Sequence, residues 1–212
     1  MNILIHLLLP IAFHFFIYPK DNNQKKSYGE VCQDIKLQKT SKDSSEIKSY
    51  FINSFYTQIF PFWVGTKWDY EGYTNEPKKG VIACGYFVST PLKHMGVNWN
   101  RYKLAQMYAS KATDAICDSI QKFSNINDLY KYLLNREDNI YHIGLSFHVG
   151  FIVKFQGKIK FLHSDYINAS GVKEENILES QALKESSIYY IGRLTNPDFL
   201  QKWKKGTKIE FE

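Results

Sequence analysis

The sequence predicts a single α+β domain, with helices in its first half and an antiparallel sheet in its second half. In the first half, apolar residues recur at helical spacing. Beyond Asn139 the pattern changes to short runs that are rich in β-branched and aromatic residues, which are typical of strands. A chain of 212 residues is long enough for one hydrophobic core and too short for two large domains.

The N-terminal part of the chain divides into an apolar segment and a polar one. Residues 3–18 are almost wholly apolar, but this run is shorter than the roughly 20 residues that a membrane-spanning helix needs. We therefore expect residues 1–19 to be a signal peptide, with an uncleaved membrane anchor as the alternative. Residues 20–45 are dominated by Lys, Asn, Gln, Ser and Asp, which predicts a polar tether. The folded domain is then expected to span residues 46–212.

The first half of this domain is predicted to be helical. Helical spacing begins near Ile47 and ends before Pro61, because proline disfavours helix in the residue that precedes it. Residues 62–79 are rich in Gly, Trp, Pro, Asn and Asp and predict a loop. A second apolar element starts at Val81, and Pro91 is expected to end or kink any helix there.

The remaining elements follow from periodicity. Residues 101–123 carry apolar side chains at helical spacing, which predicts one amphipathic helix, and residues 126–135 predict another. Four runs are predicted to be strands, at residues 140–145, 147–155, 158–164 and 187–194.

A predicted hairpin brings two histidines together. A two-residue loop at Gln156 and Gly157 gives a register in which paired residue numbers sum to 313. His148 then lies opposite Asp165, and His148 and His163 become diagonal neighbours on one face, roughly 6–8 Å apart. A three- or five-residue loop would turn the two histidines to opposite faces.

His148 is the better candidate for a general base, because imidazole titrates near neutrality and a second polar group can fix its tautomer. Either His163 or Asp165 could serve as that second group. The alternative interpretation is that His148 merely caps a strand.

Cys84 is the candidate nucleophile among the three cysteines. If a helix starts there, its free N–H groups and its dipole would lower the pKa of the thiol and favour the reactive thiolate. The alternative is a buried cysteine that acts as a small hydrophobic side chain. Cys117, midway along the predicted helix 101–123, fits that alternative, and Cys32 in the tether has no base candidate nearby.

Between Phe55 and Leu194 the chain resembles the NlpC-like cysteine peptidases of bacterial cell walls. The resemblance is carried by four stretches in matching order: Pro61-Phe-Trp-Val-Gly-Thr66, Cys84-Gly-Tyr-Phe-Val88, Phe147-His-Val-Gly-Phe-Ile152 and Phe161-Leu-His-Ser164. It implies a papain-like fold, in which helices pack on the antiparallel sheet and the catalytic cysteine begins a helix. By this resemblance Cys84 is the nucleophile, His148 the base and His163 the group that orients the base.

The chain also departs from this family, which identifies it as a divergent member. Phe62 stands where the family usually has a tyrosine whose hydroxyl reaches the site, Ala83 replaces the Asp before the cysteine, and Pro91 shortens the helix.

Four further residues are candidates for substrate binding. Trp63, Trp68 and Asp69 belong to a loop that could line the cleft, and Asp165 lies beside the predicted base. The alternative for the two tryptophans is that they are ordinary packing anchors.

The resemblance implies an exported thiol hydrolase, periplasmic or in the cell envelope, that cleaves an amide bond in peptidoglycan stem peptides without a metal or cofactor. Two rivals use the same scaffold. One is an acyltransferase or lipid-directed thiol enzyme, and the other is a non-catalytic module that binds another envelope component.

The charge of the chain is mildly basic. Lys and Arg outnumber Asp and Glu by 27 to 21, but they are dispersed rather than clustered on one element, so nucleic acid is not an expected partner. The excess of +6 fits an anionic envelope. The sequence assigns no oligomeric state.

Overall fold

The computed structural model describes residues 26–211. The expected signal peptide or anchor at residues 1–19, its apolar run at 3–18 and the first part of the predicted tether, residues 20–25, lie outside the described residues. Among the helices of residues 26–211, none combines the length and apolarity needed to cross a bilayer.

Within the described range, six antiparallel strands form one sheet in the order β1-β6-β2-β3-β4-β5. The strands are β1 (Asp118–Phe123), β2 (Asn139–Gly144), β3 (Val149–Phe155), β4 (Lys158–Asp165), β5 (Gly171–Asn176) and β6 (Tyr189–Arg193). The α-helices are α1 (Tyr28–Gln38), α2 (Ile47–Asn53), α3 (Phe60–Trp63), α4 (Cys84–His94), α5 (Arg101–Ala105), α6 (Ala109–Ile116), α7 (Ile126–Leu134), α8 (Gln181–Lys184) and α9 (Pro197–Lys205). The predicted α+β class is therefore correct.

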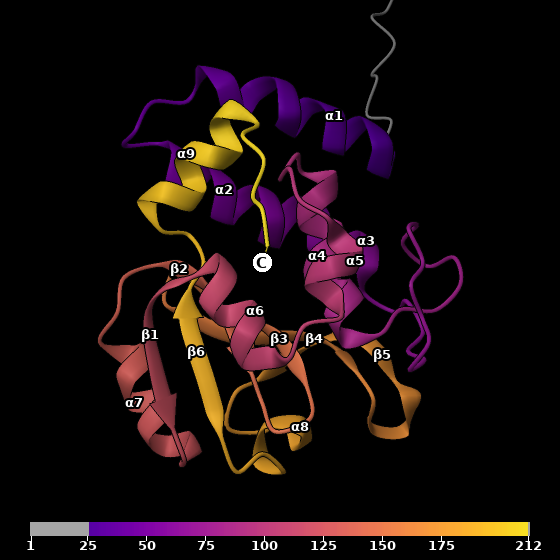
Figure 1. Cartoon of the computed structure of the whole chain (residues 1–212), viewed down its shortest axis with the longest axis vertical. Coiled ribbons are helices and arrows are strands. Elements are labelled where there is room, and N and C mark those ends of the chain that lie inside the picture. Colours follow the sequence, from indigo (N-terminus) through magenta and orange to yellow (C-terminus); the bar gives the residue numbers. More distant parts are fainter. Residues whose placement is uncertain (1–25, 212) are drawn as a thin grey trace, which may run out of the picture.

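Both faces of the sheet are covered. Side chains alternate along each strand, so Phe151 and Leu162 join the core beneath helices α1 to α6 and α9, while Ile152 and Phe161 join a second core beneath α7 and α8. Figure 1 shows this division, with α1, α2 and α9 gathered at the end of the molecule opposite α7 and α8. Helix α4 packs against β3 and β4.

The polar tether predicted for residues 20–45 is wrong from Tyr28 onward, because residues 28–38 form helix α1. Ser27 and Glu30 cap its first turn reciprocally, a capping box that satisfies two otherwise free N–H groups. Cys32 and Ile35 are buried in the main core. The polar composition did not indicate this helix, because only a narrow stripe of its surface is apolar and buried.

Lys39 ties this N-terminal segment to the C-terminal helix. It lies in a short 3₁₀ helix, η1 (Lys39–Ser41), and its buried ammonium donates to the carbonyl oxygens of Trp203, at 2.6 Å, and Gly96, at 3.0 Å. Burial lowers the pKa of this ammonium. In Figure 1 the C-terminal helix α9 (yellow) accordingly lies beside α2 (indigo). Segments from both ends of the described range thus share one core.

The predicted end of the first domain helix before Pro61 is also wrong. After α2 the helix widens into a π-helical turn, η2 (Ser54–Ile59), and continues as α3 through Trp63. At the junction the Phe60 N–H bonds to the Phe55 carbonyl oxygen, a five-residue span. We attribute the passage through Pro61, which lacks an N–H, to this wider turn.

Helix α4 begins at Cys84, three residues after the predicted start of the apolar element at Val81, and runs through Pro91 to His94. Pro91 therefore does not end the helix. A proline at this position removes one backbone hydrogen bond, and the last turn is held from outside by Tyr28, whose hydroxyl lies 2.8 Å from His94 Nδ1.

The single helix predicted for residues 101–123 is wrong. The segment forms α5, α6 and strand β1, which pairs with β6. The apolar spacing comes from two short helices in succession. Cys117 ends α6 rather than lying midway along a helix.

The remaining predicted helix and the four predicted strands are confirmed. The helix predicted at 126–135 is α7, and the four predicted strands correspond to β2, β3, β4 and β6. Strands β1 and β5 were not predicted, because both carry several charged or amide side chains.

We predict that α1 contributes to the stability of the domain. Ile35→Ala should lower the free energy of unfolding by about 2–5 kcal/mol, because Ile35 is 1% exposed and the cavity cannot refill. Leu37→Ala, on the same helix but 64% exposed, should change it by less than about 0.5 kcal/mol. Urea denaturation measures both, and equal small effects would restore the tether interpretation.

Candidate functional site

The β3–β4 hairpin has the predicted register. Phe151 pairs with Leu162 and Ile152 with Phe161, so paired numbers sum to 313. The turn residues Gln156 and Gly157 both have positive φ, 51° and 76°, the geometry of a two-residue type I′ turn. Extended by three residues beyond the Phe151–Leu162 pair, to the residue just before β3, this register sets His148 beside His163.

The two histidines are in direct contact. His148 Nε2 lies 2.8 Å from His163 Nδ1, and the ring centroids are 5.0 Å apart. Both side chains are buried. His163 also stacks on Phe161, with 4.1 Å between ring centroids, so neither ring is free to reorient without disturbing the core.

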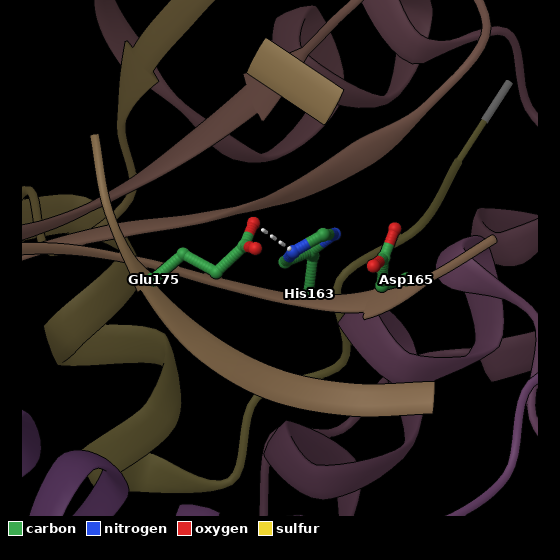
Figure 2. Close-up of side chains that lie close together, drawn as sticks. All are labelled: His163, Asp165 and Glu175. Carbon is green, nitrogen blue, oxygen red and sulfur yellow. Dashed lines mark hydrogen bonds and ion pairs between the residues drawn. The ribbon is translucent and has the colours of Figure 1, made fainter. Parts of the chain in front are cut away.

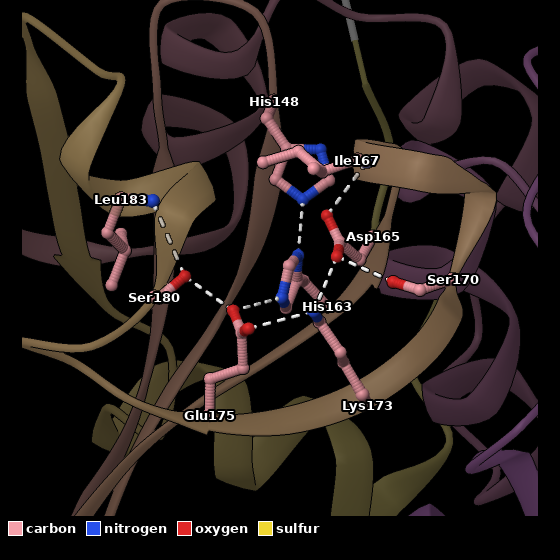
Figure 3. Close-up of polar contacts among 9 residues, drawn as sticks. All are labelled: His148, His163, Asp165, Ile167, Ser170, Lys173, Glu175, Ser180 and Leu183. Atoms are coloured by element: carbon pink, nitrogen blue, oxygen red, sulfur yellow. Dashed lines mark hydrogen bonds and ion pairs between the residues drawn. The ribbon is translucent and has the colours of Figure 1, made fainter.

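Glu175 on the neighbouring strand β5 extends this pair into a chain, which we call the relay: His148, His163 and Glu175. His163 Nε2 lies 2.9 Å from Glu175 Oε2. Ser180 Oγ donates to the same carboxylate at 2.5 Å, and the Lys173 ammonium lies 2.8 Å from it. Figure 3 shows these groups converging on the Glu175 carboxylate. Burial alone would raise the pKa of Glu175, but the bonds from His163, Lys173 and Ser180 hold it at about 2.

The hydrogen bonds of the relay bear on which ring nitrogens of His148 and His163 carry hydrogen. An ionised Glu175 accepts, so His163 Nε2 carries hydrogen. In the 2.8 Å contact between the two rings we assign His148 Nε2–H as the donor and His163 Nδ1 as the acceptor. Burial, together with the nearby His163, lowers the pKa of His148 to about 3, so this ring is neutral at pH 7. The remaining Nδ1 of His148 is therefore an unprotonated base.

Asp165 lies beside the relay rather than in it. Its carboxylate accepts from Ser170 Oγ at 2.6 Å and from the Ile167 N–H at 3.0 Å, and it pairs with Lys173 at 2.5 Å. Burial opposes ionisation, but these bonds keep the pKa of Asp165 low. These hydrogen bonds and the ion pair occupy the Asp165 carboxylate. Two pockets border Cys84, and Asp165 lines neither of them.

Figure 2 shows that His163, Asp165 and Glu175 converge closely enough to resemble a metal-binding group, with one ligand atom of each within 4.8 Å of the others. The ammonium of Lys173 already bridges the two carboxylates. Both ring nitrogens of His163 are also hydrogen-bonded. A metal ion would have to displace these bonds, and the cluster is better described as the electrostatic support of the relay.

Several contacts hold Cys84 at the start of α4. Ser164 Oγ, on the strand that carries His163, donates to the Ile82 carbonyl oxygen at 2.7 Å. The Ala83 N–H bonds to the Gly72 carbonyl oxygen at 2.8 Å. At Gly85 a Cβ atom would lie 2.3 Å from the Ala105 carbonyl oxygen, so only glycine lets α5 approach α4 this closely.

The expected lowering of the Cys84 pKa is not what the structure gives. Burial raises the pKa of this thiol, although the backbone N–H groups of Val149, Gly85 and Cys84 itself favour the thiolate. Desolvation outweighs the helix N-terminus here. Since Val149 directly follows His148, the sulfur lies next to the start of β3. In the part of the chain that the structure describes, no hydrogen bond joins the Cys84 sulfur to the His148 ring, whose Nε2 is bonded to His163.

Two pockets meet at Cys84 and His148, which line both of them. One, of about 420 Å³, runs toward α5 and α6, and we call it the α6 pocket. The other, of about 650 Å³, runs toward the loop before α4, and we call it the loop pocket. Ligands can therefore reach the sulfur and the base from two sides.

The four predicted substrate-binding residues lie in different surroundings, and one of them lines a pocket. Trp68 lines the loop pocket. Trp63 does not, because it is completely buried and donates its indole N–H to Tyr28; it is a packing anchor. Asp69 is exposed and accepts from the Glu71 N–H in a turn, outside both pockets. Asp165 is engaged as described above.

The other cysteines lie elsewhere. Cys32 is buried on α1, and burial raises the pKa of the Cys117 thiol at the end of α6. Phe62, which stands where the resemblance places a tyrosine, packs against Tyr28. Tyr166, whose ring centroid is 5.1 Å from that of His148, lines the loop pocket instead.

Sequence reasoning missed Glu175, Lys173 and Ser180. The available signal was the alternation in Gly171-Val-Lys-Glu-Glu-Asn176, where Lys173 and Glu175 fall on one face of a strand. Their charge made the segment resemble a loop.

Comparison with known proteins gives no match: no family model, curated protein or solved structure is similar to this chain at the level of significance applied.

Proposed function

We propose that this protein is a thiol hydrolase with a papain-like arrangement, in which Cys84 is the nucleophile, His148 the general base and His163 the group that orients the base. The observation that carries the proposal is the relay, which leaves an unprotonated His148 nitrogen in the same two pockets as a cysteine at a helix N-terminus.

In the first half of the reaction, the Cys84 sulfur attacks a carbonyl carbon while its proton passes to His148 Nδ1. His148 then becomes positively charged, and the relay stabilises it through His163 and the ionised Glu175. The C–N bond of the tetrahedral intermediate breaks, and the amine leaves with the proton from His148.

The second half reverses these roles. Water gives a proton to His148 as it attacks the thioester carbon, the C–S bond breaks, and the sulfur takes the proton back. The net reaction converts one amide and one water into a carboxylic acid and an amine.

The start of α4 supplies electrostatic help. The N–H groups in the first turn of a helix have no partner within that helix. The backbone N–H of Cys84 is therefore placed to donate to the oxyanion of the tetrahedral intermediate.

The resemblance to NlpC-like peptidases makes the amide bonds of peptidoglycan stem peptides the first substrate class to test, with the protein acting in the periplasm or cell envelope. An acyltransferase would use the same groups and pass the acyl group to an acceptor other than water. Product analysis with the candidate acceptors separates the two.

Catalysis should depend on Cys84 and His148. With 4-nitrophenyl acetate as a generic acyl donor, Cys84→Ala should abolish turnover, and His148→Ala should lower kcat/KM by about 10²–10⁴-fold because the proton acceptor is lost. Cys32→Ala is the control and should retain activity. Turnover that survives Cys84→Ala would exclude the mechanism.

Glu175 should act as a positioning residue through the relay. Glu175→Gln should lower kcat by at least about tenfold, because a neutral amide no longer fixes the tautomer of His163 or stabilises the imidazolium. Glu174→Gln is the matched control on the opposite face of β5, where Glu174 accepts from Tyr56. The pH–rate profile distinguishes a relay role from a structural one, since only the former shifts the limb governed by His148. Equal rates for the two variants would remove Glu175 from the mechanism.

The resting thiol should be protonated at neutral pH. Because burial raises the pKa of Cys84 and lowers that of His148, both groups are neutral at pH 7. The rate of Cys84 alkylation by iodoacetamide should therefore rise with pH, with a midpoint above the ~8.5 of an ordinary thiol. N-acetylcysteine in the same buffers is the reference. A plateau already reached below pH 7 would instead indicate a preformed thiolate–imidazolium pair.

A further inference from the structure

The α6 pocket has an unusual lining for a site that is built around a polar reaction. Among the described residues that line it, none is Asp, Glu, Lys or Arg. Its walls come mainly from apolar side chains on α4, on residues 104–112 and on the segment between β2 and β3, among them Val88, Leu104, Met107, Ala112 and Leu145.

The two histidines in this lining do not add charge at neutral pH. Burial lowers the pKa of His142 to about 4 and that of His148 to about 3. His142 Nδ1 is also hydrogen-bonded to Thr113 Oγ1, at 2.8 Å. A charged group that entered the pocket would lose its hydration without gaining an opposite charge, which is strongly unfavourable.

The rim of the pocket supplies a second, independent observation. Phe147, Tyr108 and Tyr70 are 96%, 86% and 83% exposed, and all three line this pocket. Large aromatic side chains gathered at one place on the surface mark binding sites rather than ordinary surface. The volume of about 420 Å³ falls within the roughly 300–1,000 Å³ of small-molecule sites.

We propose that the α6 pocket binds an uncharged alkyl or acyl chain of the substrate, so that the scissile bond of an apolar substrate is presented to Cys84. This inference rests on the proposed function and narrows its substrate class. Carboxylates and amines are not complementary to the pocket, so the part of the substrate that enters it is apolar, and charged parts of the same substrate lie outside it.

The test uses chloroacetamides, which alkylate thiols and need no knowledge of the natural substrate. The full protein is treated with N-methyl-, N-octyl- and N-(7-carboxyheptyl)-chloroacetamide, and alkylation of Cys84 is followed by peptide mass spectrometry. The octyl probe should react at least about tenfold faster than the methyl probe, because its chain is buried in the pocket. The carboxylate-ended probe should show no such advantage.

Two neighbouring residues provide matched variants. Met107 lines the α6 pocket and not the loop pocket, whereas Gln106 lines the loop pocket and not the α6 pocket. Met107→Glu should abolish the advantage of the octyl probe, and Gln106→Glu should preserve it. For each variant the rate with the octyl probe is divided by the rate of the same variant with the methyl probe, so a change in the basal reactivity of Cys84 cancels in the comparison.

The outcomes separate the two proposals. If Cys84 reacts with the methyl probe in a His148-dependent manner but gains nothing from the octyl chain, the apolar subsite is excluded and the hydrolase proposal stands. If the carboxylate-ended probe matches the octyl probe, the subsite is likewise excluded. If Cys84 reacts with no probe, or reacts equally in His148→Ala, the proposed function fails and the subsite with it.

Discussion

The pairing of β3 with β4 decides which side chains can meet at the site. A slip of one residue would turn the whole of one strand over, because the side-chain period of a strand is two. The φ values of Gln156 and Gly157 fix the turn, and the turn fixes the register that sets His148 beside His163. Strand β5 then brings Glu175 next to His163. The residue just before β3 and one residue from each of β4 and β5 thus make up the relay.

The charges around this site balance one another. Asp165 and Glu175 are both ionised close to His163, and Lys173 bridges them. The Lys173 ammonium offsets the repulsion between the two carboxylates, which lie on neighbouring strands. The support of the relay is therefore electrostatic as well as steric.

The sequence alone was sufficient for the register of the β3–β4 hairpin, since the register depends on a local signal, a glycine in a two-residue turn. The sequence was insufficient where contacts with distant parts of the chain, rather than local composition, determine the secondary structure. Helix α1 is mostly polar and is held by Cys32, Ile35 and the contacts of Lys39 with distant carbonyl oxygens. The helix that passes through Pro61 required a π turn that no local rule predicts.

The same limits applied to the site. His148, His163 and Cys84 were identified because their residue types are reactive and their spacing is informative, whereas Glu175 resembled a solvated surface charge. The raised pKa of Cys84 was missed for another reason: the helix N-terminus is visible in the sequence, but the extent of desolvation depends on α5 and the start of β3, which are distant in the chain. Trp63 and Trp68 look alike in the sequence, and only packing separates the buried anchor from the pocket wall.

Helix α5 approaches α4 closely at Gly85. The two helices bring together two sets of residues that come from different parts of the chain. The groups to which we assign the reaction come from the start of α4, from the residue before β3 and from strands β4 and β5, whereas most of the apolar walls of the α6 pocket come from residues 104–112. Those walls include no member of the relay. Under the proposed mechanism, substitutions in that stretch change which molecules reach the sulfur and leave the relay intact, so substrate preference and chemistry can change independently.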